Sequence, residues 1–198
     1  MITKETYELM KTEYGRVGSW AVWDPAASTP KSNTDGMNWL SAPNLLEVLD
    51  TGFIFVGLNW SSTHGDQTKA GTLDWTNFHS SYSYQHDYKL RYALSETRYW
   101  GSYMTDFIKL YPEVDSAKVK KYLKQSPEVI DKSVAIFEEE IGYLQKNPVL
   151  VAMGGDVYRL LDKNLGHKYQ IAQIKHYSSY ISKEDYREGV LNVLDILK

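Results

Sequence analysis

With 198 residues, of which 42% are apolar and 14% aromatic, the chain is long enough to bury the core of one domain and too apolar to be disordered. It has no cysteine, which excludes disulfides, cysteine-ligated zinc and iron–sulfur clusters, and its formal charge of −3 provides no overall basic field for nucleic acid. We expect one α/β/α domain over residues 1–198, with an N-terminal helix and a long loop in residues 1–50 packed on the rest. No stretch has the apolar length of a signal peptide core or a membrane span, so we expect a soluble, cytoplasmic protein with no membrane partner.

Four short apolar runs along the chain are typical of buried strands. The runs at 53–58 and 149–154 are continuously apolar, as expected for strands that are covered on both faces. A third run lies at 101–107, and a fourth at 169–176 begins with alternating polar and apolar residues. That alternation predicts that the fourth strand lies at an edge of the sheet.

Helical patterns separate these strands. Strands that alternate with helices predict a mostly parallel sheet between helical layers. Ser182, with Asp185 three residues later, is a capping arrangement that marks the start of the last helix. The predicted helices are 87–100, 126–147, 156–164 and 182–198.

Polar residues and glycines follow the predicted strands, where ligands bind in sheets of this kind. They are Asn59, Asp106, Gly154, Gly155 and His176. Simpler roles stay open: Asn59 can stabilise a turn, Asp106 can cap a helix, and the two glycines can permit a tight strand-to-helix turn. A histidine is often structural, but the position of His176 at the end of a parallel strand favours a role in a site.

Four segments near these strand ends occur in the order of known family motifs: "VGLNWS", "SYMTDFIKLYP", "NPVLVAMGGDVYRLL" and "IKHYSSYI". In order and spacing they resemble the uracil-DNA glycosylase superfamily over roughly residues 50–195. The resemblance implies a three-layer α/β/α sandwich with a central, mostly parallel four-stranded sheet. It also implies metal-independent hydrolysis of the N-glycosidic bond of a damaged or flipped base.

The resemblance assigns a role to each candidate. Asn59 positions the attacking water and His176 stabilises the departing base, as a reaction through an oxocarbenium-like state requires. Asp106 reads the base edge, and Phe78 is our choice for the ring that stacks on the flipped base. The remaining substrate-binding candidates are Gly57, Trp60, Tyr103 and Ser178.

Three positions depart from the family pattern. Trp60 and Tyr177 stand where a proline usually follows the polar residue of the first and last motifs. Asp106 stands where related sequences often have asparagine. An ionised carboxylate accepts from uracil N3–H but repels O4, whereas a protonated Asp106, which requires a raised pKa, matches both.

DNA and a small nucleobase-like ligand are the expected partners. The alternative function is non-catalytic binding of a nucleobase, a nucleotide or another small polar ligand on the same fold. No metal or cofactor is expected, because His64, His79 and His86 have no metal-ligand spacing. The aromatic stretch at 78–88 is either a stacking surface or an ordered lid, and the lysines at 118–124 indicate a solvated helix face.

Overall fold

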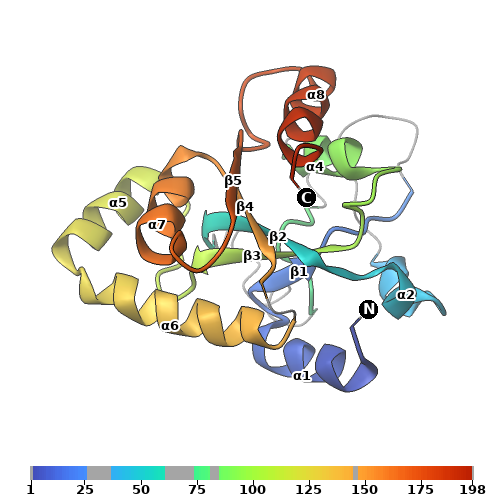
Figure 1. Ribbon diagram of the computed structural model, residues 1–198, viewed down its shortest axis with the longest axis horizontal. Helices are drawn as coiled ribbons and strands as arrows, with labels where there is room; N and C mark the ends of the chain where they lie inside the picture. The colour runs from blue at the N-terminus through green and yellow to red at the C-terminus, as the bar shows by residue number, and fades with distance from the viewer. Residues whose placement is uncertain (1, 26–36, 61–73, 81–84, 145–146, 198) are drawn as a thin grey trace.

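The computed structural model describes residues 2–25, 37–60, 74–80, 85–144 and 147–197. Within them, a five-stranded sheet has the strand order β1-β3-β2-β4-β5 (Figure 1). The strands are β1 (Gly18–Trp20), β2 (Asp50–Asn59), β3 (Ser102–Ile108), β4 (Val149–Met153) and β5 (Ile171–Ile174). β2 pairs in parallel with β3 and β4, and β4 pairs in parallel with β5. The carboxyl ends of these four strands therefore lie at one edge of the sheet.

The expectation of four strands is wrong by one. The additional strand, β1, pairs antiparallel with β3, and it lies in the N-terminal segment that we expected to contain only a helix and a loop. Its three residues are too few to produce an alternating pattern, so pairing with β3 alone defines it. The edge position of the fourth predicted strand is confirmed, because β5 ends the sheet.

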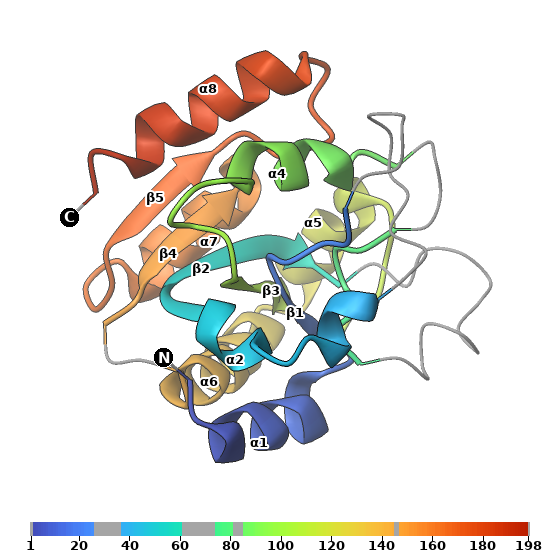
Figure 2. The ribbon, with the colours of Figure 1, turned by 90° about the vertical axis from the view of Figure 1, so that its right-hand side faces the viewer.

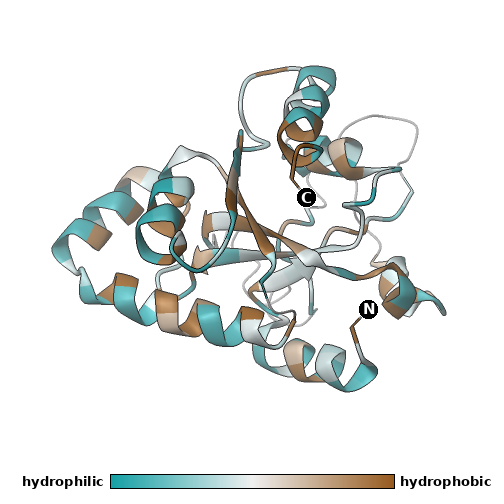
Figure 3. Ribbon diagram, in the orientation of Figure 1, coloured by the Kyte–Doolittle hydropathy of each residue, from teal (hydrophilic) through white to brown (hydrophobic). Residues whose placement is uncertain are grey.

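Helices cover both faces of the sheet (Figure 2). One face packs against α1, α5, α6 and α7 through a core that includes Ile54 and Leu150. The other face packs against α4 and α8 through Phe55 and Val151. Figure 3 shows apolar residues along the central strands and hydrophilic residues on the outer sides of the helices. Neighbouring residues of β2 thus enter opposite cores, which explains its continuous apolar run.

Helix ends follow local chemistry. Ser182 caps the last helix as predicted, because its hydroxyl accepts from Asp185 N–H at 3.0 Å. The helix predicted over 87–100 stops at Leu94, and Glu96 then takes a left-handed φ of 58° as the chain turns toward β3. Within the described ranges, no helix is long and apolar enough to cross a membrane. The helices are α1 (Lys4–Tyr14), α2 (Leu45–Val48), α4 (Asp87–Leu94), α5 (Ser116–Gln125), α6 (Glu128–Gly142), α7 (Gly155–Leu165) and α8 (Lys183–Leu194), with a 3-10 turn at Asn38–Ser41.

A buried carboxylate joins α6 to β3. Glu140 is fully buried, and its Oε2 lies 2.6 Å from Lys109 Nζ. The hydroxyls of Tyr103 and Thr105 both donate to Glu140 Oε1 at 2.8 Å. Lys109 also donates to the backbone carbonyl of Asp106 at 2.6 Å. The network holds β3, and with it the backbone of Asp106, against the helix.

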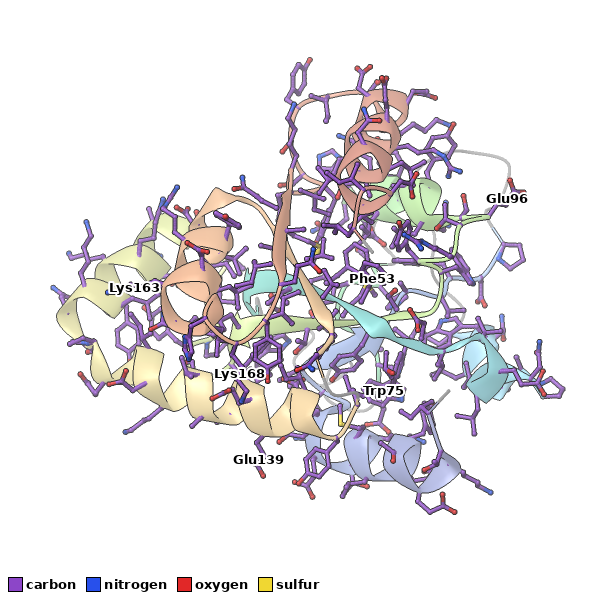
Figure 4. All side chains as sticks on the ribbon, in the orientation of Figure 1. Phe53, Trp75, Glu96, Glu139, Lys163 and Lys168 are labelled. Carbon is purple, nitrogen blue, oxygen red and sulfur yellow. The ribbon has the colours of Figure 1, made fainter. Side chains whose placement is uncertain are left out.

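Removing the Glu140 carboxylate tests this anchor. Glu140→Ala leaves the Lys109 ammonium buried without its counter-charge, so we expect a loss of about 3–5 kcal/mol in the free energy of unfolding, measured by urea denaturation. Glu139→Ala, on the outer side of the same helix (Figure 4), should change it by less than about 0.5 kcal/mol. Equal losses in the two variants would contradict a special role for Glu140.

Candidate functional site

A carboxyl group and an aromatic ring lie over a glycine near the carboxyl end of β2. Gly57 pairs with Asp106 in the sheet, and a Cβ atom at Gly57 would overlap Asp106 Oδ1. The same Cβ would stand 3.3 Å from Phe78 Cε1. A residue with a Cβ atom at position 57 would therefore displace these side chains, so glycine is required where they lie over β2. Of the predicted site residues, the structure brings Gly57, Phe78 and Asp106 into contact.

Burial sets the protonation of Asp106. The pKa of this carboxyl is raised from its ordinary value of 3.8 to about 7, chiefly because burial disfavours the charged form. The hydrogen bond from Asn77 and the charge of Lys109 lower the pKa, and the charge of Glu140 raises it. Both protonation states of Asp106 are consequently populated near neutral pH. The alternative role as a helix cap is wrong, because Asp106 lies within β3.

The loop at 74–80, which carries Phe78, is fastened to the N-terminal segment of the chain. Trp75 packs beside Tyr7 of α1, with ring centroids 5.7 Å apart (Figure 4). Four hydrogen bonds connect the loop to residues 15–20. They are Trp75 N to Gly15 O at 2.6 Å, Ser19 Oγ to Trp75 O at 2.7 Å, Asn77 Nδ2 to Val17 O at 2.7 Å, and His79 Nε2 to Trp20 O at 3.1 Å. The N-terminal segment, for which the sequence suggested no role in the site, thus positions the loop that carries Phe78.

His176 is a neutral imidazole. Its Nδ1 accepts from Ser178 N–H at 3.2 Å and lies 2.8 Å from Ser178 Oγ, so the ring proton is on Nε2. Burial lowers the pKa of His176 to about 4, and its ring lies against that of Tyr177 in a tilted arrangement with centroids 4.3 Å apart. Nε2–H is therefore a donor that stays neutral at physiological pH.

Asn59 is the last residue of β2, and its side chain is partly committed to the backbone. Its Nδ2 donates to Glu113 O at 2.6 Å and to Trp60 O at 3.2 Å. This bonding supports the structural role that we left open, because it ties the loop after β3 to the end of β2. In the described part of the chain, no group donates to Asn59 Oδ1, which leaves that oxygen as an acceptor.

Register shows how Asn59 and His176 are related. Val56 pairs with Ala152, and Ala152 pairs with Gln173. Asn59 ends β2, and His176 follows β5, whose last residue is Ile174, so both lie beyond the carboxyl ends of their strands, with β4 between these two strands. They are on neighbouring parts of one rim rather than at opposite edges of the sheet.

Tyr177 links the loop after β5 to the Asp106 group. The pKa of its hydroxyl is raised by burial and further by the negative charges of Asp87 and Asp106. Tyr177 and Phe78 also pack against the same apolar cluster. Tyr177 therefore contacts His176 through its ring and lies near the charge of Asp106.

Two other predicted residues lie outside this group. Tyr103 is fully buried on the opposite face, where its hydroxyl donates to Glu140. Trp60 is half-buried, and its N–H donates to Ile108 O at 3.1 Å beside the end of β3. Sequence reasoning missed Asn77, whose only signal was its position before Phe78.

Of the three histidines considered for a metal site, the structure describes His79 and His86. His79 lies between Trp23 and Trp39, at centroid distances of 5.0 and 5.6 Å, and burial lowers its pKa to about 3. His64 lies outside the described residues, as do residues 81–84 of the aromatic stretch. Across the described ranges, no three His, Cys, Asp or Glu side chains are grouped to hold a metal ion.

Comparisons of the chain with family models, with curated proteins and with solved structures return no match. The residues near the carboxyl edge and their geometry are therefore the basis for proposing a function.

Protonation of Asp106 predicts a pH-dependent stability. The folded protein holds a proton on Asp106 up to a pKa of about 7, whereas an unfolded aspartate loses it at about 4. The stability that comes from burying the neutral form is therefore lost as the pH rises through this window.

Asp106→Asn removes this dependence. In urea denaturation, its stability relative to the wild type should increase by about 1.4 kcal/mol per pH unit between about pH 4 and 7, and then level off. The exposed Asp162→Asn is the control. A constant difference between wild type and Asp106→Asn across this range would show that Asp106 is ionised throughout.

Proposed function

We propose that the protein is an N-glycosidase of the uracil-DNA glycosylase type, which acts on a flipped or single-stranded damaged base without a metal. The observation that carries the proposal is the meeting of Phe78 and Asp106 over Gly57. A flipped base needs an aromatic face to stack on and a polar group to read its edge. Phe78 and Asp106 supply these two groups at the edge where ligands bind in parallel sheets.

The raised pKa of Asp106 removes the mismatch with uracil. A protonated carboxyl donates from one oxygen and accepts at the other. In the proposed complex, Asp106 Oδ1–H donates to uracil O4, and Oδ2 accepts from N3–H. Since the pKa is about 7, this form is available near neutral pH. Asp106 then matches uracil as an asparagine amide would.

The two catalytic candidates have complementary chemistry. When the glycosidic bond breaks, the sugar becomes positive and the base leaves as an anion. His176 Nε2–H donates to the base oxygen where negative charge develops. Asn59 Oδ1 accepts a hydrogen bond from the attacking water and orients it beneath the sugar. Because an amide is a weak base, Asn59 positions the water without strongly deprotonating it.

A DNA partner is supported by Tyr180 in the loop that follows His176. This tyrosine is fully exposed. An exposed aromatic ring four residues after His176 offers a stacking surface for a base next to the flipped one. The net charge of −3 gives the protein no overall basic surface. Stacking on an aromatic ring does not require one.

The second candidate is a non-catalytic protein that binds a nucleobase, a nucleotide or another small polar ligand. The bond from Asn59 Nδ2 to Glu113 O favours this candidate, because it gives the asparagine a structural role that does not depend on a catalytic water. In this case Phe78 and Asp106 contact the ligand, and no reaction follows.

An abasic-site assay separates the two candidates. Single-stranded oligonucleotides that contain uracil, hypoxanthine or thymine are incubated at about pH 6.5, and strand breaks are scored after alkali. Asn59→Ala and His176→Ala should each lower the rate by about 100-fold or more. Asn164→Ala, which loses a comparable bond to Leu160 O on α7, is the control and should keep the rate. Retention of the oligonucleotide without cleavage would support the binding protein. If the protein neither cleaves nor retains the oligonucleotide, both candidates are ruled out.

Stacking by Tyr180 gives a separate prediction. Tyr180→Ala should weaken binding of single-stranded DNA by about tenfold, because one base loses its stacking partner. Tyr143→Ala, at another exposed tyrosine just after α6, should leave the affinity unchanged. Fluorescence anisotropy of a labelled oligonucleotide measures both. Equal affinities for the two variants would contradict a stacking role for Tyr180.

A further inference from the structure

We propose that Asn77 is the positioning residue of the base pocket, an inference that rests on the proposed function. Its amide nitrogen holds the carboxyl of Asp106, and its amide oxygen holds the backbone of Phe78. The group that reads the base and the ring that stacks on it are thereby kept in one arrangement by a single side chain.

The contacts of Asn77 use its whole amide. Nδ2 donates to Asp106 Oδ2 at 2.9 Å and to Val17 O at 2.7 Å. Oδ1 accepts from Phe78 N–H at 3.1 Å. The opposite orientation would set Oδ1 against two acceptors and Nδ2 against a donor, so the amide has one stable orientation. Asn77 therefore connects β3, the segment before β1 and the loop at 74–80.

Phe78 requires such support because its backbone is unfavourable. It has a φ of 65°, in the left-handed region that bulky side chains rarely adopt. His79 N–H donates to Thr76 O at 3.1 Å and closes a turn around Asn77 and Phe78. The bond from Phe78 N–H to Asn77 Oδ1 lies inside that turn and stabilises the conformation that aims the ring at Gly57.

Asn77 also decides which oxygen of Asp106 carries the proton. Oδ2 accepts from Asn77, so protonation takes place at Oδ1, the oxygen that lies over Gly57. Oδ1 is then a donor toward the base in the protonated form and an acceptor in the ionised form. The pH at which the pocket changes from one to the other depends on the Asn77 donor, because this bond favours the ionised carboxylate.

Other charges face Asp106, and none of them replaces Asn77. Lys109 favours the ionised form and Glu140 opposes it. On the other side, Tyr177 lies near both Asp106 and Asp87, and burial, together with these negative charges, keeps its hydroxyl neutral by raising its pKa. Among the described groups around Asp106, Asn77 is the neutral donor that bonds directly to the carboxyl.

The test is a carboxyl ¹³C NMR titration of Asp106 in the full chain, with the resonance assigned from Asp106→Asn. Asn77→Ala should raise the pKa of Asp106 by about one unit, because the ionised form loses a donor. It should also accelerate amide hydrogen exchange of Phe78 by about tenfold or more. Asn164→Ala, a remote asparagine variant, should change neither quantity.

Asn77→Asp separates the bond to Asp106 from the bond to Phe78 while the shape of the side chain stays nearly constant. An aspartate keeps the oxygen that accepts from Phe78 N–H but loses the donor to Asp106. We expect the pKa of Asp106 to rise at least as far as in Asn77→Ala, while Phe78 remains protected. Because this variant keeps the volume of the side chain, it tests the loss of the donor without the cavity that Asn77→Ala leaves. An unchanged pKa of Asp106 in both variants, or unprotected Phe78 in Asn77→Asp, overturns the proposal.

The pH profile of uracil release connects the inference to function. In the wild type the rate should fall as Asp106 ionises, and in Asn77→Ala the midpoint should move up by about one pH unit. A merely structural role would lower the rate at every pH without moving the midpoint, and that result overturns the proposal. If the wild type neither cleaves nor binds the oligonucleotide while the NMR shift is present, the proposed function fails and the coupling of Asn77 to Asp106 stands.

Discussion

The buried carboxylate of Glu140 is the interaction on which the arrangement of the central sheet depends. Its partners are the ammonium of Lys109, which follows β3, and the hydroxyls of Tyr103 and Thr105 within β3. A carboxylate removed from water is tolerated only when such partners compensate it. The network therefore specifies how α6 lies against β3. Lys109 also bonds to the backbone carbonyl of Asp106, so the network helps to fix the position of the Asp106 carboxyl group on the opposite face of β3.

The two carboxyl groups beside β3 have opposite surroundings. Glu140 has a cation in direct contact, whereas the carboxyl of Asp106 is bonded to the neutral amide of Asn77. Burial consequently raises the pKa of Asp106 to about 7. One environment produces a structural ion pair and the other produces a group that exchanges a proton near neutral pH. Titratable groups of the second kind are common at functional sites, and this one lies near the carboxyl edge of the sheet, where sheets of this kind generally bind ligands.

The candidate site residues come from distant parts of the chain. Gly57 and Asp106 come from adjacent central strands, Phe78 from a loop, and Tyr177 and His176 from the segment after β5. The loop that carries Phe78 depends on hydrogen bonds to the backbone of residues 15–20. Because of these bonds, the N-terminal segment belongs to the architecture of the site and not only to the exterior of the fold.

The sequence alone determined the elements whose signals are local. The apolar run at 53–58 predicted the centre of β2, and the Ser182 and Asp185 pair predicted the start of α8. Tertiary structure decided whatever depends on contacts between distant residues. β1 exists because three residues pair with β3, Tyr103 faces Glu140 rather than the pocket, and Asn77 bonds to Asp106 across 29 positions. The protonation of Asp106 belongs to this second group as well, because a pKa depends on burial and neighbouring dipoles, which exist only once the chain has folded.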